Sequence, residues 1–177
     1  MRSSYKGFTL IELLVVIAII GVLSSIVLSA LNTARNKGND AAVKSNLDGA
    51  RSQSELFYDS NGNKYVVTPG GATDVCSATG SVGSPAVKGI YAQVLAAAQS
   101  AGLQTVNTTI GTSGSVNIST CHACFAGEAS TDCTGTRDGW AAEAPLKNVV
   151  GAVYCVDSSG NSTTTVTSLG PGDTKCG

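Results

Sequence analysis

The first third of the chain changes abruptly from apolar to polar sequence. Between residues 8 and 31 only Glu12 is charged, and one threonine, one glycine and three serines dilute an otherwise apolar run. A bilayer-spanning helix needs about 20 predominantly apolar residues, so this run is long enough to cross a membrane. Arg2 and Lys6 precede it, and basic residues hold the adjacent end of a span in the cytoplasm. The pattern therefore predicts that the rest of the chain is extracytoplasmic.

Residues 32–58 predict an amphipathic helix that continues the apolar one. Its apolar stripe consists of Val43, Leu47, Ala50, Ser54 and Phe57. Leu56 and Tyr58 widen this stripe. The outward side carries the charged residues Lys44, Asp48, Arg51 and Glu55. A single helix over residues 8–58 would be about 75 Å long at about 1.5 Å per residue. Asp59 to Asn63 predict the turn that ends it, in preference to a calcium loop, because the EF-hand glycine and terminal glutamate are missing.

The remaining residues, 59–177, predict a globular head. Residues 68–89 are rich in Gly, Ser and Thr and predict a loop, residues 90–101 a short helix stopped by Gly102, and residues 105–120 a strand or extended loop. Three strands follow, over 138–144, 149–156 and 162–166, with turns at 146–148 and 157–161. The expected fold class is α+β, with the long N-terminal helix packed on a small antiparallel β-sheet.

Composition narrows the functional classes. Of the 177 residues only 13% are charged and 5% aromatic, and the formal net charge is −1. Without residues 1–7 the chain would hold 9 basic and 12 acidic side chains, a net charge of −3. A nucleic-acid binder should show a clustered basic face, so no nucleic-acid partner is expected.

Six cysteines, all in the expected extracytoplasmic part, predict disulfide bonds. They are Cys76, Cys121, Cys124, Cys133, Cys155 and Cys176. Three bridges can form in 15 ways, and spacing alone does not choose among them. Zinc bound by Cys121, Cys124 and Cys133 with His122 is the competing interpretation, but His122 stands between two cysteines, where its ring is poorly placed. We expect disulfides, no metal and no cofactor. With one histidine in the chain and no catalytic constellation, we expect no enzymatic activity.

Glu12 distinguishes the apolar run from an ordinary membrane anchor. An ionised carboxylate in lipid costs several kcal/mol, so a carboxylate there is a functional hypothesis by default. A secretory signal peptide cut after Ala30 is one rival interpretation, although Leu28 is bulky where a small residue is wanted. A plain single-pass anchor is the other. Neither rival needs an acid at the start of its apolar segment.

The sequence around Glu12 resembles the class III leader of type IV pilins and of type II secretion pseudopilins. The matching residues are Lys6-Gly7-Phe8-Thr9-Leu10-Ile11-Glu12 before the apolar run. The resemblance weakens toward Tyr58 and returns in the Cys-Val-Asp-Ser-Ser-Gly segment from Cys155. It implies that residues 1–7 are removed by a prepilin peptidase, which cuts between Gly7 and Phe8 and N-methylates Phe8. It also implies a bridge between Cys155 and Cys176.

The resemblance implies a structural subunit of a type IV pilus-like filament. Its partners would be copies of itself and other pilins, the prepilin peptidase, an inner-membrane assembly platform and, before assembly, the lipid bilayer. Residues 8–31 would bundle in the filament core, and Glu12 would meet the Phe8 amine of a neighbouring subunit. The alternatives are a type II secretion pseudopilin, a minor pilin of DNA uptake, and a membrane-anchored extracytoplasmic binding or redox module.

Overall fold

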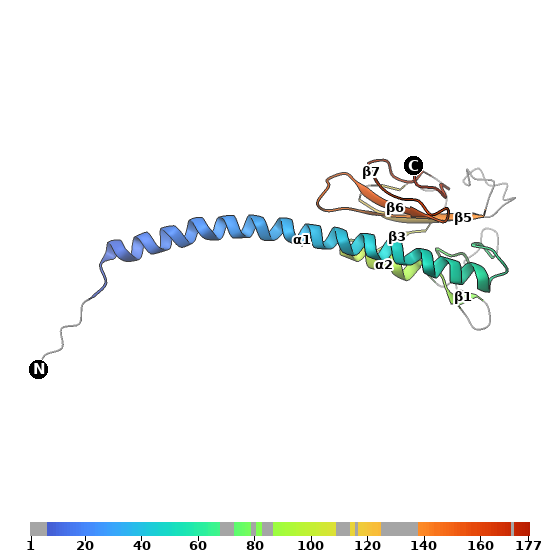
Figure 1. Cartoon of the computed structure of the whole chain (residues 1–177), viewed down its shortest axis with the longest axis horizontal. Coiled ribbons are helices and arrows are strands. Elements are labelled where there is room, and N and C mark those ends of the chain that lie inside the picture. Colours follow the sequence, from blue (N-terminus) through green and yellow to red (C-terminus); the bar gives the residue numbers. More distant parts are fainter. Residues whose placement is uncertain are drawn as a thin grey trace, which may run out of the picture. The chain divides into compact units, whose positions relative to one another are not determined.

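A computed structural model describes most of the chain (Figure 1). The described residues are 7–67, 73–78, 81–82, 87–108, 114–115, 117–124, 138–170 and 172–177. They form two compact units, an N-terminal unit that ends at Asn36 and a head unit of Lys37–Gly177. The first six residues of the expected leader, residues 125–137 and Cys133 within them lie outside the described part.

One helix accounts for both predicted helical segments. Helix α1 runs over Leu10–Ser60 and is 51 residues long. In the head unit its expected stripe, from Val43 to Phe57, is fully buried. Leu56, predicted to widen this stripe, is instead 56% exposed, because it lies about 100° around the helix from Phe57.

The turn at residues 59–63 ends α1 as predicted. The Asn61 side-chain amide donates a hydrogen bond to the Phe57 carbonyl at 2.6 Å. Gly62 and Asn63 then take positive φ angles of 66° and 60°, a conformation that glycine and asparagine tolerate best. Asn61 therefore caps a helix end, which supports the turn rather than a calcium loop.

The sheet of the head unit has five strands in the order β3-β4-β5-β6-β7. They are β3 (Val106–Asn107), β4 (Ser119–Cys124), β5 (Gly139–Pro145), β6 (Val153–Asp157) and β7 (Ser162–Thr165). The last four pair antiparallel in sequence order, whereas β3 pairs parallel with β4. The sheet is thus mixed, not wholly antiparallel. Helix α2 (Tyr91–Ser100) and the two-stranded pair β1 (Ser81–Val82) and β2 (Val87–Lys88) complete the elements.

The two faces of the sheet are buried in different ways. One face contributes Trp140, Ala142 and Val156 to the main core, which also holds the α1 stripe and Val94 and Ala97 of α2. The opposite face carries a smaller cluster of Ala141, Cys155, Leu169 and Cys176. The chain after β7 therefore covers the face that the helices leave open.

Strand β4 was missed by the sequence patterns, and β6 is shorter than expected. All six residues of β4 are buried, so the strand shows no alternation of apolar and polar residues, and it is poor in bulky β-branched or aromatic side chains. The predicted strand 149–156 begins only at Val153. Residues 149–152 instead form a turn, in which Gly151 has a φ of 77°.

Two disulfide bonds join described residues. Cys76 is bonded to Cys121, and Cys155 to Cys176, the pair that the resemblance implies. Cys124 is also disulfide-bonded. Cys121 faces the main core, and the side chain three residues further along β4 lies on the opposite face. The two cysteines of the Cys-His-Ala-Cys segment therefore do not converge on one ion, and the zinc interpretation is not supported.

Candidate assembly site

The side chains of Thr9 and Glu12 cap the N-terminus of α1. Glu12 accepts hydrogen bonds from the Thr9 backbone N–H at 2.9 Å and from the Thr9 hydroxyl at 2.7 Å. The Thr9 hydroxyl in turn accepts from the Glu12 backbone N–H at 3.3 Å, and the Thr9 carbonyl from the Leu13 N–H. This is a capping box, which satisfies backbone donors that a helix start leaves unpaired.

The capping box was not part of the sequence prediction, although its signal was present. Thr9-Leu10-Ile11-Glu12 has the spacing of a threonine N-cap followed by glutamate three residues later, directly before an apolar run. Glu12 therefore has a local partner within its own chain. Any contact with a second subunit would be added to this role or would replace it.

No described part of the chain buries the apolar half of α1. Its large apolar residues, from Leu10 to Leu31, are between 44% and 80% exposed. Of the described helices, α1 is the one that is long and apolar enough to cross a membrane. An apolar surface of this extent marks a site that another protein or a membrane covers.

Gly7 and Phe8 lie in non-helical backbone just before this surface. Both are exposed, and Phe8 is 91% exposed. An ideal Cβ built at Gly7 would meet no atom within 4 Å. The fold itself thus does not require glycine at this position.

In the head unit, two carboxylates hold turns in place. Asp40 of α1 accepts hydrogen bonds from the backbone N–H groups of Lys147 at 2.6 Å and Asn148 at 3.0 Å. Asp157, at the end of β6, accepts from the backbone N–H groups of Asn161 and Cys176, both at 3.0 Å. Such bonds to the charged form hold the pKa of Asp157 below its ordinary value although the burial of this carboxylate acts in the opposite direction.

Glu143 of β5 is a buried acid of a different kind. It is fully buried, and one carboxyl oxygen accepts from the Leu169 N–H at 3.0 Å. The other oxygen has no hydrogen-bond partner among the described residues, and an ideal Cβ at residue 114 would lie 1.9 Å from it. A side chain at residue 114 would therefore force the Glu143 carboxyl group to move. Burial raises the pKa of Glu143 to about 7, and nearby Asp173 adds to the shift while the Leu169 N–H opposes it.

We expect the head to lose stability as the pH rises toward neutrality. The folded state holds the Glu143 proton more tightly than the unfolded state, whose glutamate has an ordinary pKa near 4.5. The stabilisation is therefore complete below that value and is lost as the pH rises through about 7, by about 3 kcal/mol in all. Glu143→Gln should remove most of this slope in urea unfolding followed by the fluorescence of buried Trp140.

Asp59→Asn is the matched control, because Asp59 is exposed at the end of α1 and should leave the slope unchanged. A smaller slope of the same sign should remain in Glu143→Gln, since burial also raises the pKa of Asp74, to about 6. An undiminished slope in Glu143→Gln would assign the pH dependence to other groups.

A family model and a curated protein each match part of this sequence. Residues 2–28 match the family model of the prokaryotic N-terminal methylation motif. Over 66 residues the chain is 44% identical to the type IV wide pilus major component PilA4 of Thermus thermophilus. This match covers 37% of the chain and 49% of PilA4, so the chain spans about half the length of this curated relative. No solved structure matches the chain significantly. The chain therefore carries the N-terminal methylation motif and is similar over part of its length to a type IV pilin.

Proposed function

We propose that the protein is a structural subunit of a type IV pilus-like filament. The observation that carries this proposal is the exposed apolar half of α1, most of which lies within the methylation motif of residues 2–28. In a filament, apolar helices from several copies would bury this surface against one another, and the heads would form the outside. Recovery of the polypeptide in filaments sheared from cells would support the proposal, and its absence from them would contradict it.

Before assembly, the same helix would anchor the protein in the inner membrane. Its exposed apolar surface suits lipid as well as it suits other helices. Arg2 and Lys6 favour a cytoplasmic N-terminus and an extracytoplasmic head. An assembly platform in that membrane and the prepilin peptidase are the further partners that this route requires.

A role for the protein as a redox module is less well supported. The four cysteines of the two described bridges are at most 9% exposed. Redox-active cysteines need access to their partners, so these bridges fit a structural role. The similarity to a type IV pilus component also supports a non-enzymatic structural subunit.

Processing between Gly7 and Phe8 gives a direct test of maturation. Mass spectrometry of the mature N-terminal peptide should find it to begin with N-methylated Phe8. Gly7→Val should leave uncut precursor in the membrane, because a branched side chain should not fit a protease pocket that accepts glycine. A mature chain that begins at Leu31 would instead establish a secretory signal peptide.

The matched control is Gly21→Val, within the apolar half of α1. An ideal Cβ at Gly21 also meets no atom within 4 Å, and the site lies well away from the expected cut. Cleavage should be normal in this variant. Loss of cleavage in both variants would indicate a general sensitivity to branched residues rather than recognition of Gly7.

A further inference from the structure

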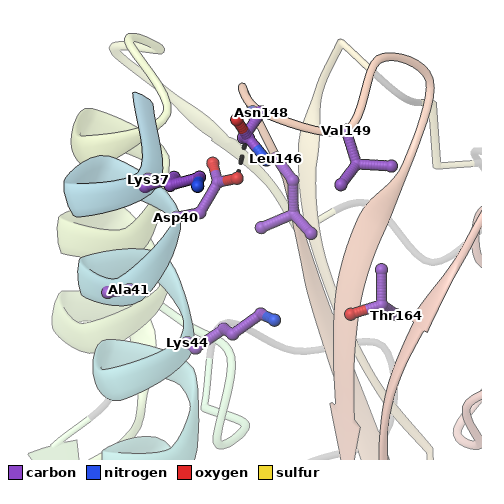
Figure 2. A pocket seen from close by; sticks show the side chains of 8 residues that line it. All are labelled: Lys37, Asp40, Ala41, Lys44, Leu146, Asn148, Val149 and Thr164. Carbon is purple, nitrogen blue, oxygen red and sulfur yellow. Dashed lines mark hydrogen bonds between the residues drawn. The ribbon is translucent and has the colours of Figure 1, made fainter. Parts of the chain in front are cut away.

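A hollow in the head unit lies between α1 and the sheet. Its volume is about 280 Å³, and its lining includes Lys37, Lys44, Leu146, Val149 and Thr164. Figure 2 shows the two lysines on α1, with Leu146, Val149 and Thr164 across from them. Lys37 and Lys44 are seven residues apart, which places their Cα atoms about 10 Å apart on nearly the same side of the helix. The hollow thus combines two ammonium groups with an apolar wall.

The positive charge of this hollow is only partly balanced within it. Asp40 is the acidic residue of its lining, and both of its carboxyl oxygens already accept backbone N–H groups. Lys44 lies over the Tyr154 ring, 5.4 Å from its centroid, which fixes the direction of its side chain. One wall continues into exposed apolar surface, because Val149 is 46% and Val150 is 94% exposed. An occupant that matches this surface carries an acid close to an apolar side chain.

The chain itself carries such a combination at the other end of the same helix segment. Leu56 is 56% exposed and Asp59, one turn further on, is also exposed. The Leu56–Asp59 pair lies about 25 Å along α1 from the hollow. It also lies about a quarter-turn around the helix from the hollow. One molecule therefore cannot bring its own pair to its own hollow, but a second copy displaced along the helix direction can.

We propose that the hollow of one subunit receives Asp59 and Leu56 of a second copy, in a contact between the head units of two neighbouring subunits in the filament. The inference rests on the proposed function, because the two copies would be neighbours in the filament. The contact joins two different surfaces. Such heterologous contacts propagate into open helical assemblies rather than closing into dimers. Asp59 would lie between Lys37 and Lys44, and Leu56 would pack against Val149 and Val150. The ionic part of the contact lies at the surface and weakens as salt screens it.

Carbodiimide cross-linking of sheared filaments tests the contact directly. This reagent joins an amine to a carboxylate without a spacer. Lys44 and Asp59 are about 22 Å apart along one helix, so a Lys44–Asp59 cross-link can arise only between two molecules. We expect mass spectrometry to find Asp59 joined to Lys44 or Lys37, with a yield that falls severalfold in high salt and is abolished in Asp59→Asn.

Charge exchange in the full-length chain provides the second test. The Lys37→Glu/Lys44→Glu variant should lower filament yield about tenfold, because like charges would then face each other across the contact. Adding Asp59→Lys to that variant should restore the yield, which a folding defect would not allow. Lys88→Glu, at an exposed position of β2 outside the hollow, should have no effect.

The outcomes separate this contact from the filament function. Normal wild-type filaments without an Asp59 cross-link, or without rescue by Asp59→Lys, would overturn the contact and leave the filament function intact. Cross-links from Lys37 and Lys44 to a different protein would also overturn it, as would occupation by lipid phosphate, which gives no such cross-link. Absence of the polypeptide from filaments would overturn both proposals.

Discussion

Full-length protein carrying Glu12→Gln is expected to insert and to be processed normally, yet to be nearly absent from filaments. The substitution removes the charge from the apolar segment, which makes insertion easier. Glutamine can replace glutamate in a capping box, so the start of α1 should remain intact. What disappears is the carboxylate that would meet the N-methylated Phe8 amine of a neighbour. Such a pair neutralises two charges in an apolar core and fixes the register between subunits.

Thr9→Ala separates docking from helix capping. It removes the hydroxyl that bonds to Glu12 but keeps the Thr9 N–H and the Glu12 charge. A lost N-cap hydroxyl costs about 1 kcal/mol, which the long helix should tolerate, so filaments should persist. The measurement is the amount of processed protein in the membrane and in sheared filaments for each variant. Normal filaments in Glu12→Gln, or an equal loss in Thr9→Ala, would refute the docking role.

The long helix was predictable because its signals are local and repeated. The stripe from Val43 to Phe57 recurs over several turns, and each turn reinforces the same periodicity. The strands containing Trp140, Tyr154 and Thr164 were also found, because β-branched and aromatic residues between turn signals mark strands. Leu56 shows the limit of such patterns, since apolar character does not reveal which side of a helix the head covers.

The elements that the sequence did not reveal depend on distant parts of the chain. All of β4 is buried, with α2 against it and Cys124 in contact with the Gly172 carbonyl after β7, and a short window of sequence contains no trace of either contact. The parallel pairing of β3 with β4 likewise depends on where α2 returns the chain. Asp40 and Glu143 appeared in the sequence as ordinary acids. Their roles come from Asn148 and Leu169, which are 108 and 26 residues away in the sequence.

Loss of the Cys76–Cys121 bridge should be the most destabilising change in the head. The bridge joins residues 45 apart, and a closed loop of this length stabilises by about 4 kcal/mol in the chain-entropy model. It also fastens a segment with little regular structure. In that segment, Val75 accepts the Ile90 N–H at 2.7 Å and donates to the Tyr65 carbonyl at 2.8 Å. These backbone bonds tie the segment to Tyr65 and Ile90, whereas the disulfide ties it to β4.

The comparison of two double variants makes this expectation specific. Cys76→Ala/Cys121→Ala should lower the free energy of unfolding by about 4 kcal/mol, and Cys155→Ala/Cys176→Ala by about 3 kcal/mol, since the latter bridge spans 21 residues. Urea unfolding of the full-length protein in detergent reports this through Trp140, which is fully buried and is the one tryptophan in the chain. Because Trp140 belongs to the head unit, its signal excludes any melting of the apolar half of α1. A smaller loss in the Cys76 variant than in the Cys155 variant would show that loop length does not set the contribution of these bridges.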